Sequence, residues 1–437
     1  MSIDRRAILG LLSAGMVLPA SVLQAQSNSE FQNNTLRIQR AINEATAQGR
    51  PWQVPSGVTR VGNLRLPDGA HLIGQPGRSR IVLADNGPLI TVERAARITL
   101  QGIGFEGGMR VAGRDGGLLQ FRDVNDIRLQ DCSLDRFGGN GVLLERCGGR
   151  LTGNTLRDNG RAAIFSLDGR GLRIEGNVVE RSGENGILVW RSVKGEDGTI
   201  VRANRILDTR ATAGGTGEYG NAIGLFRAGG VIAEGNFIRR AAFTAIRNNS
   251  GSNVIVANNN IAACGEVALY AEFAFDGTSI TGNIVDGAWG GIEVTNFADH
   301  GGRIAAVTGN VIRNIRMGKH AGTGEFGGGK GIFVEGDAAI SGNIVEQAER
   351  TGLQLGWGPS LRDVTATGNT LRECGNGIEI SVAPGAGHAT VVGNTISGAK
   401  QKAIVGMQWH KLVTGDLAVV GAQDWPKIRL AQNVVRS

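Results

Sequence analysis

The sequence predicts an all-β fold, a single-stranded parallel β-helix in which the chain winds through many stacked coils. A tetrad of the form Gly-Asn-x-apolar appears at Gly153-Asn154-Thr155-Leu156 and recurs with Asn-to-Asn steps of 23 to 33 residues. A strand motif, Gly/Ala-apolar-x-apolar, follows most tetrads, as in Gly186-Ile187-Leu188-Val189. A fixed period in this range is typical of stacked-repeat architectures. The later tetrads carry Asn177, Asn204, Asn236, Asn259, Asn283, Asn310, Asn343, Asn369 and Asn394.

The strand motif shows the alternation of a strand and not the spacing of a helix. Apolar residues occupy every second position, as in the pairs Ile187/Val189 and Ile292/Val294, and this places them on one side of a strand. One unit is too short to bury its own apolar face, so neighbouring units must stack into roughly ten or more coils, each rising about 4.8 Å. The 70 Gly residues provide backbone angles closed to other residues, and Asn tolerates the left-handed conformation while its amide bonds to the Asn of the next coil.

Residues 1–25 are predicted to be an export signal and not part of the fold. Arg5 and Arg6 precede a modestly apolar stretch from Ile8 to Leu23, and small residues follow up to Ala25. This arrangement looks like a twin-arginine signal; a Sec-type signal or a chance arginine pair is the alternative. We expect the twin-arginine translocase as a partner during export, and a mature protein in the periplasm or outside the cell. The rest of the chain has no run of eighteen apolar residues, which disfavours a membrane span in the mature protein.

The predicted elements follow in order. Apolar residues at helical spacing from Leu36 to Ala45 predict a capping helix over 33–50, which covers the open edge of the first coil. The β-helix is expected over 51–411, and 412–437 departs from the repeat and is expected to form a C-terminal cap.

The beginning of the predicted β-helix also resembles a known family. A short helix containing Ile38-Gln39-Arg40-Ala41-Ile42 is followed by Val54-Pro55-Ser56-Gly57 and then by His71-Leu72-Ile73-Gly74. This order is similar to the start of right-handed β-helix proteins of the pectate-lyase superfamily. Together with the arginine pair and the Gly-Asn repeats, the chain resembles the uncharacterised twin-arginine-translocated repeat proteins of bacteria. The resemblance implies a right-handed helix, but it carries no catalytic residues to transfer.

Two coils are lengthened, and their loops are related. Asn177 to Asn283 and Asn204 to Asn310 are both 106 residues, which indicates that four coils have been duplicated. The long loops at 209–220 and 316–330 contain similar sequences: Gly215-Thr216-Gly217-Glu218-Tyr219-Gly220 and Gly322-Thr323-Gly324-Glu325-Phe326-Gly327. Long insertions in a regular solenoid are often functional. The alternative is that the loops are related only by duplication and pack an aromatic ring on the outer sheet.

The strand residues that alternate with the apolar ones are expected to face solvent. Between the two lengthened coils they would form the floor of a trough, with the long loops as its walls. Aromatic rings beside carboxylates suit a carbohydrate, because rings stack on the apolar faces of sugars and carboxylates accept bonds from their hydroxyls. The predicted substrate-binding residues are Trp190, Glu218, Arg247, Tyr270, Glu325, Glu335 and Trp357.

Glu272 and Glu293 are the candidate catalytic residues. Strand geometry separates them by about 8 Å, within the roughly 6.5–9.5 Å that an inverting glycosidase needs for an acid and a base. Exposed acids on a ladder also produce such pairs by chance, and Arg247 has the simpler role of a salt-bridge partner for Glu272. His320, in the second long loop, is predicted to be solvated.

Charge and cysteine content limit the partners. The formal charge of +7 comes from dispersed Arg and Lys residues without a basic stripe, so nucleic acid is disfavoured and an anionic polysaccharide or envelope component is expected. No Cys/His spacing indicates a metal site, and no cofactor is evident. Cys264 and Cys374 are expected to be buried free thiols.

These observations predict an exported β-helix protein that binds or processes polysaccharide in the trough. Whether it is an enzyme stays open; if it is, a polysaccharide lyase or a glycoside hydrolase is expected. The alternative is a non-catalytic envelope scaffold or adhesion protein, since this fold serves both kinds of function.

Overall fold

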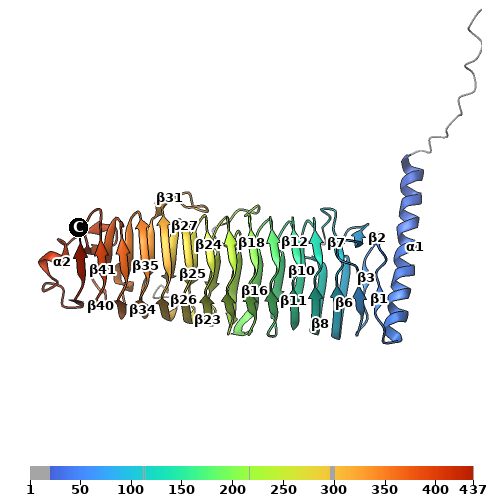
Figure 1. The fold of residues 1–437 in the computed structure, drawn as a ribbon, viewed down its shortest axis with the longest axis horizontal. Coiled ribbons are helices and arrows are strands. Elements are labelled where there is room, and N and C mark those ends of the chain that lie inside the picture. Colours follow the sequence, from blue (N-terminus) through green and yellow to red (C-terminus); the bar gives the residue numbers. More distant parts are fainter. Residues whose placement is uncertain (1–19, 112, 114, 216, 296–300, 437) are drawn as a thin grey trace, which may run out of the picture.

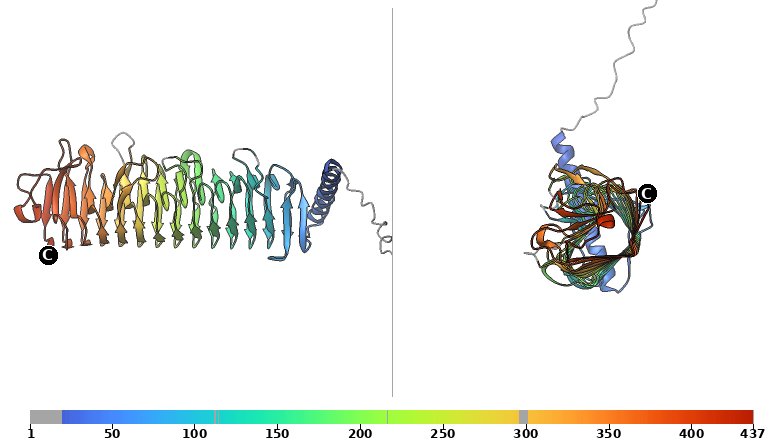
Figure 2. Two further views of the ribbon diagram at one scale, coloured as in Figure 1. Left: turned by 90° about the horizontal axis from the view of Figure 1, so that it is seen from above. Right: turned by 90° about the vertical axis from the view of Figure 1, so that its left-hand side faces the viewer.

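The protein is a long solenoid, seen from the side in Figure 1. A computed structural model describes residues 20–111, 113, 115–215, 217–295 and 301–436. Strands are stacked side by side along the long axis, with helix α1 (Ala20–Ala47) across one end and the short helix α2 (Leu417–Val420) near the other. Viewed along this axis in Figure 2, the coils superimpose around a common interior. The predicted parallel β-helix is therefore confirmed.

Each coil contributes strands to three faces. In one coil these are β16 (Ile187–Glu196), β17 (Ile200–Arg202) and β18 (Arg205–Leu207). They pair in parallel with β19 (Ile223–Gly229), β20 (Ile232–Glu234) and β21 (Phe237–Arg239) of the next coil. In the described part of the chain, such pairing builds one sheet of 28 strands and one of 15. We call the row of strands that contains β16 and β19 the first face.

The first face carries the candidate site. In order along the axis its strands around the site are β10 (Asn140–Glu145), β13 (Ile164–Leu167), β16, β19, β22 (Ile246–Asn249), β25 (Val267–Glu272), β28 (Gly290–Thr295), β33 (Lys330–Val334), β36 (Thr351–Leu355) and β39 (Asn376–Ser381).

The core fills the interior of the coils. Ile187 and Val189 of the first face, Val201 of the second and Ile206 of the third are all fully buried. Each inward residue stacks on its equivalent in the next coil, as Ile187 does on Ile223. Because burial of apolar area is the main favourable term in folding, this repeated stacking holds neighbouring coils together.

A ladder of buried asparagines runs along the turn between the second and third faces. Asn259 shows the pattern: its Oδ1 accepts from the backbone N–H and the Nδ2 of Asn236, at 3.0 and 2.9 Å. Its own Nδ2 donates to Ala233 O at 3.0 Å and to Asn283 Oδ1 at 2.9 Å. The amide-to-amide bond predicted from the sequence is therefore confirmed, and every polar atom of the buried amide has a partner, as burial requires.

The left-handed conformation belongs to the residue before each ladder asparagine and not to the asparagine itself. Gly153, Gly176 and Gly282 have φ of 66°, 65° and 65°, and where glycine is missing Ala203 takes φ 54°. None of the ladder asparagines has a positive φ, so the tolerance of Asn for this conformation is not used at the ladder positions. Glycine leads the tetrad because it enters this region of φ without strain.

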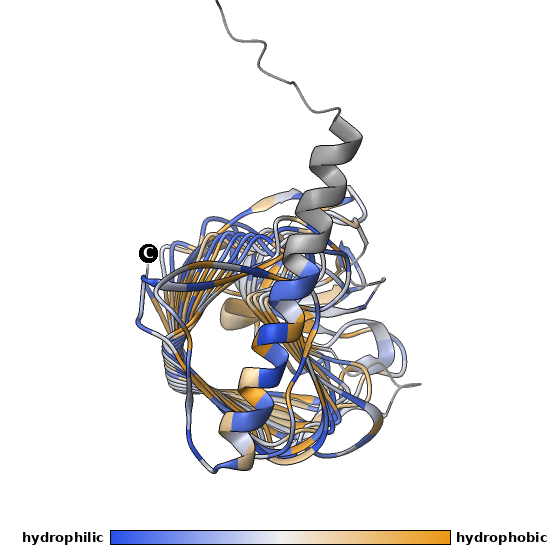
Figure 3. Ribbon diagram, turned by 90° about the vertical axis from the view of Figure 1, so that its right-hand side faces the viewer, coloured by the Kyte–Doolittle hydropathy of each residue, from blue (hydrophilic) through white to orange (hydrophobic). Residues whose placement is uncertain are grey.

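Helix α1 covers one end of the solenoid, and Figure 3 shows it lying across the first coil. Helix α1 extends well before the expected start at residue 33, and its Ile38, Ile42 and Ala45 are buried. At the other end, β44 (Ile428–Ala431) and β45 (Val434–Arg436) form one more coil. Asn433 continues the ladder there by accepting from Asn394 N at 3.1 Å, so the expected cap over 412–437 includes a true coil.

The long loops leave the solenoid on its first-face side. The loop at 209–220 joins β18 to β19, and the loop at 316–330 lies between β30 (Val311–Ile315) and β33. The second loop contains an antiparallel hairpin of β31 (Met317–Lys319) and β32 (Phe326–Gly328). Cys132, Cys147, Cys264 and Cys374 are buried free thiols. None of the described helices is both long enough and apolar enough to span a membrane. Arg5 and Arg6 lie outside the described residues.

Replacing Asn259 with alanine should lower the free energy of unfolding by about 2–4 kcal/mol, because backbone and amide groups above and below it would be buried without partners. Urea denaturation followed by circular dichroism measures this loss. Asn433→Ala is the control, because this last rung is only partly buried and water can replace its bonds. Equal losses in the two variants would contradict a stabilising role for the buried ladder.

Candidate functional site

The outward residues of the first face stand in straight columns, as the sequence predicted. One column aligns Leu188, Gly224, Arg247, Tyr270 and Glu293 on successive strands. The neighbouring column aligns Trp190, Phe226, Asn249, Glu272 and Thr295. Parallel pairing without register shifts between these residues brings side chains that are 20 to 40 positions apart in sequence into contact.

These columns are not uniformly exposed, which corrects the sequence-based expectation. Glu272, Glu293 and Glu335 are only 3%, 5% and 0% exposed. Part of this burial comes from the long loops, which fold back over the first face. Gly217 of the first loop lies so close to Arg247 that a Cβ there would be 2.0 Å from Nη1, and His320 of the second loop reaches Glu266 of the floor. An outward direction on a strand therefore does not mean contact with solvent where a loop folds back.

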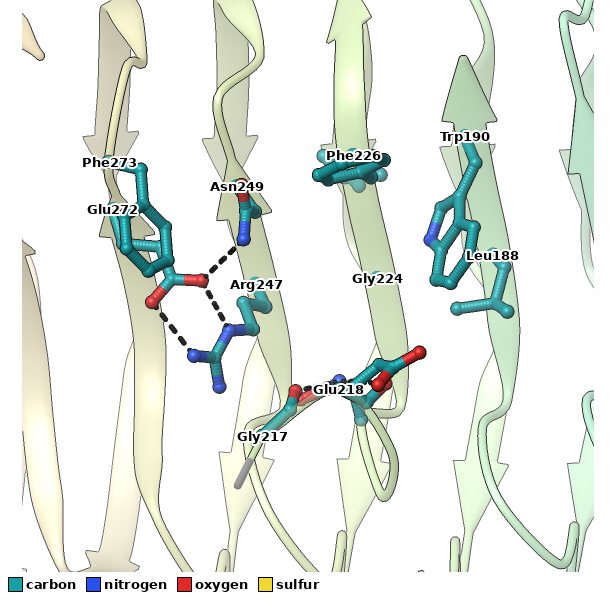
Figure 4. A pocket seen from close by; sticks show the side chains of 12 residues that line it. Leu188, Trp190, Gly217, Glu218, Gly224, Phe226, Arg247, Asn249, Glu272 and Phe273 are labelled. Atoms are coloured by element: carbon teal, nitrogen blue, oxygen red, sulfur yellow. Dashed lines mark hydrogen bonds and ion pairs between the residues drawn. The ribbon is translucent and has the colours of Figure 1, made fainter. Parts of the chain in front are cut away.

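An open cavity of about 370 Å³ lies over β16, β19, β22 and β25, with the loop at 209–220 as one wall. We call it the Trp190 cavity; Figure 4 shows it from close by. Trp190 and Phe226 lie on one side of it, Arg247 and Glu272 on the other, and Glu218 projects from the loop. A site of this size, with aromatic walls and a few polar groups, is typical of small-molecule and sugar binding.

A second cavity of about 450 Å³ adjoins the first toward the N-terminus. Both are lined by Leu188, Trp190 and Glu218, so they meet at these residues, and we call the two adjoining cavities together the groove. The further lining of the second cavity includes Asp115, Glu145, Arg161, Phe165, Glu184, Asn185 and Tyr219.

Three aromatic rings form a row along the groove. Phe165, Trp190 and Phe226 come from the successive strands β13, β16 and β19. The ring centroids of Phe165 and Trp190 are 5.2 Å apart and those of Trp190 and Phe226 are 5.6 Å apart. The row therefore follows the solenoid axis.

Arg247 is the centre of a buried ionic network. Its Nε and Nη2 donate to the two oxygens of Glu272 at 2.7 and 2.8 Å, and its Nη1 donates to Glu266 Oε2 at 3.0 Å. Asn249 Nδ2 adds a bond to Glu272 Oε1 at 2.9 Å. The predicted salt bridge between Arg247 and Glu272 is confirmed, and it is bidentate, the strongest geometry for this pair.

His320 joins the second long loop to this network. Its Nε2 lies 3.0 Å from Glu266 Oε1, while its Nδ1 accepts from the backbone N–H groups of Gly322 and Thr323 at 3.1 Å each. A neutral ring with its proton on Nε2 satisfies all three contacts. Its side chain is only 13% exposed, so the expectation that it is solvated is wrong.

Burial raises the pKa of a carboxyl group, whereas a positive charge beside it lowers the pKa, and both effects act on the acids of this network. Burial raises the pKa of Glu272 above its usual value, although the hydrogen bonds and charge of Arg247 oppose this. Burial also acts to raise the pKa of Glu266, but the hydrogen bond from His320 and the charge of Arg247 outweigh it and hold the pKa low. Burial raises the pKa of Glu293, whose Oε1 has no hydrogen-bond partner among the described residues.

The structure brings together only part of the predicted site. Trp190, Glu218, Arg247 and Glu272 line the groove. Tyr270 is half-buried beside it, with the Arg247 guanidinium 4.9 Å from its ring.

The other predicted site residues do not line the groove. Glu293 and Glu335 are buried, Glu325 is exposed on the second loop, and Trp357 packs against His410 at 4.6 Å. The open space thus lies closer to the N-terminus than the trough expected between the two loops.

Several lining residues escaped the sequence analysis. Phe165, in Ala163-Ile164-Phe165-Ser166, occupies the outward position one coil before Leu188, so extending the Leu188 column by one strand would have found it. Asn221, Glu184 and Arg161 lie outside the strands, where the repeat pattern carries no signal. Among the described residues, no group of three His, Cys, Asp or Glu could hold a metal ion.

Comparisons with known proteins agree with this architecture. A family model described as the right-handed β-helix region matches residues 82–206, 140–301 and 192–362. No curated protein matches the sequence.

Solved structures give a likeness of fold only. The catalytic unit of a thermostable α-1,3-glucanase from Streptomyces thermodiastaticus is 16% identical, with a TM-score of 0.51 over 92% of this chain and 67% of that one. A tailspike protein of Escherichia coli bacteriophage HK620, in complex with a pentasaccharide, is 13% identical, with a TM-score of 0.47 over 91% and 74%. The surface adhesin PfbA of Streptococcus pneumoniae is 12% identical, with a TM-score of 0.42 over 91% and 96%.

Replacing Arg247 with methionine should lower the free energy of unfolding by about 3–5 kcal/mol at neutral pH, because two buried carboxylates lose their partner. Burial already raises the pKa of Glu272, and without Arg247 the bonds and charge that oppose this rise are lost, so its folded-state pKa moves further above the unfolded value. Stability should then fall as the pH rises from about 4 to about 7, so the deficit relative to the wild type should be smaller near pH 4. Denaturation midpoints across this range measure it.

Arg240→Met is the matched control for this change. Arg240 also makes a bidentate pair, with Asp208, but its side chain is 57% exposed. Its loss should cost less than about 1 kcal/mol. A deficit for Arg247→Met that does not change with pH would contradict the role given to the two buried acids.

Proposed function

This chain belongs to the family of right-handed β-helix proteins, and from that premise we propose that it binds a polysaccharide in the groove. The observation that carries the proposal is the row of Phe165, Trp190 and Phe226, which lines the two adjoining cavities of the groove. Aromatic rings offer apolar faces on which sugars stack, and the carboxylates beside them accept hydrogen bonds from hydroxyl groups.

The direction of the row supports a polymer as the ligand. Its rings come from successive strands about 4.8 Å apart, so a chain lying along the solenoid axis would meet one ring after another. The two cavities extend in the same direction because they share Trp190 and Glu218. The likeness in fold to an α-1,3-glucanase supports the same class of ligand.

Export is part of this proposal. Polysaccharides of the cell envelope lie outside the cytoplasm, and the arginine pair Arg5-Arg6 would direct the chain there through the twin-arginine translocase. Cell fractionation, with both arginines replaced by lysine as the control, tests this placement.

Trp190→Ala should weaken polysaccharide binding at least about tenfold, because it removes the central ring of the row and aromatic anchors dominate such interfaces. Affinity electrophoresis against a panel of bacterial and plant polysaccharides measures the loss. Phe326→Ala is the control, since Phe326 is 71% exposed on the second long loop and does not line the groove. Equal behaviour of the two variants would reject the groove as the binding site.

Cleavage of the bound glycan is the second candidate function. It is favoured by the raised pKa of both Glu272 and Glu293, since a general acid must keep its proton near neutral pH. Two other observations favour glycan binding without cleavage: Glu272 is held by a bidentate bond from Arg247, and Glu293 is buried. The assignment of these two acids as catalytic residues stays a prediction.

If the pair is catalytic, Glu272→Gln and Glu293→Gln should each lower the rate of glycan breakdown at least about 100-fold, as expected for loss of a general acid or base. Release of reducing ends, or of unsaturated products, is the measurement. Binding by both variants should persist. Breakdown at the wild-type rate would exclude this mechanism, and a wild type without turnover would leave binding as the function.

A further inference from the structure

We infer that the groove selects a glycan that carries protonated amino groups, such as a de-N-acetylated amino-sugar polymer, and excludes polyuronates. This inference rests on the proposed function, because it names the chemical class of the polysaccharide bound there. It comes from the charges and hydrogen bonds of the lining residues.

The residues that line the groove include more carboxylates than guanidinium groups, in contrast to the whole chain. The described lining residues include five carboxylates and two guanidinium groups: Asp115, Glu145, Glu184, Glu218, Glu272, Arg161 and Arg247. The chain as a whole has a formal charge of +7. The anionic polysaccharide expected from the net charge does not match this surface, because opposite potentials attract and like potentials repel across an interface.

Both arginines are already neutralised by carboxylates. Arg247 is bound to Glu272 and Glu266. Arg161 Nη2 lies 3.3 Å from Glu184 Oε2, and its Nη1 lies 3.6 Å from Asp115 Oδ1. Proteins usually bind a carboxylate through the guanidinium group of an arginine. Neither arginine of the groove presents an uncompensated charge to a uronate.

Glu218 differs from the other acids of the groove. It is exposed, lines both cavities and forms no ion pair with any described cation. Its place on the loop is fixed by its carbonyl oxygen, which accepts from Asn221 Nδ2 at 3.3 Å. Glu218 therefore offers an uncompensated negative charge at the junction of the two cavities.

The hydrogen bonds of the Trp190 cavity point to the same ligand. Most of its side-chain donors are engaged: Arg247 and Asn249 donate to Glu272, and Asn221 Nδ2 donates to Gly217 O at 2.8 Å. By contrast, the acceptor Asn221 Oδ1 is buried and has no partner among the described residues. Asn221 itself is only 2% exposed.

A lining that offers acceptors requires a ligand that donates. An ammonium group has three donors and no acceptor, whereas an ionised carboxylate has only acceptors. In this cavity an amino sugar can donate to Asn221 Oδ1 and Glu218, whereas a uronate would leave those acceptors unpaired and bring its own charge beside Glu218.

The test compares oligomers of glucosamine, N-acetylglucosamine and galacturonic acid by isothermal titration calorimetry with the full chain, at a pH below the pKa of the amine. The expected order of affinity is glucosamine, then N-acetylglucosamine, then galacturonic acid. Glu218→Gln should weaken glucosamine binding about tenfold, as for a lost charge-assisted bond, and change N-acetylglucosamine binding less than about twofold.

Glu325→Gln is the matched control. Glu325 occupies the corresponding place in the second long loop, after the same Gly-Thr-Gly sequence, but it does not line the groove. Its replacement should leave all three affinities unchanged. Galacturonic acid binding as tight as glucosamine, or equal effects of Glu218→Gln and Glu325→Gln, would overturn the inference.

The outcomes separate this inference from the proposed function. Binding of acidic or neutral oligomers that Trp190→Ala abolishes would keep the groove as a polysaccharide site and reject the selection of amino sugars. Absence of binding by every oligomer and by the polysaccharide panel would reject the proposed function, and the inference with it.

Discussion

The in-register stacking of buried asparagines is the constraint on which the rest of the structure depends. Each ladder amide bonds to the coil before it and to the coil after it, as Asn259 does to Asn236 and Asn283. A slip of one residue would leave these amides buried without partners, at a cost comparable to a large share of a domain's stability. The ladder therefore sets the register of every strand that follows it in a coil.

Fixed register has a direct consequence for the outer surface. Side chains at one position of the repeat form straight columns, so Trp190 stands beside Phe226, and Phe165 of the neighbouring column reaches Trp190 from the preceding coil. The long insertions lie where the chain leaves the sheets, in the loops before β19 and β33. The surface of the rod can thus change through its loops and outward residues while the core stays the same, which is how one fold serves many functions.

The two long loops show how similar sequences acquire different roles. Gly217 in the first loop is pressed against Arg247, whereas a Cβ at the corresponding Gly324 would meet nothing within 4 Å. The second loop forms a hairpin and sends His320 down to Glu266, while the first leaves Glu218 at the groove. Their shared residues reflect their common origin, and their surroundings determine what those residues do.

The sequence by itself determined the β-helix, its core and the alignment of its columns, because period and alternation are local properties of the chain. Ile187 and Val189 are buried, and Arg247 meets Glu272, as alternation and register require. The sequence also contained the final rung, but Asn433 was missed because Gln432 stands where the tetrad usually has glycine.

Only the tertiary structure decided which outward residues are open to a ligand. Glu272, which lines the groove, and Glu293, which does not, are both outward residues of neighbouring columns, and their alternation along the strand does not show which one a ligand can reach. The difference arises from how loops distant in sequence fold back over the strands, as His320 does over Glu266. Such contacts depend on side-chain packing between segments that share no pattern, so burial, charge compensation and the position of the groove could not be predicted from the period of the repeat.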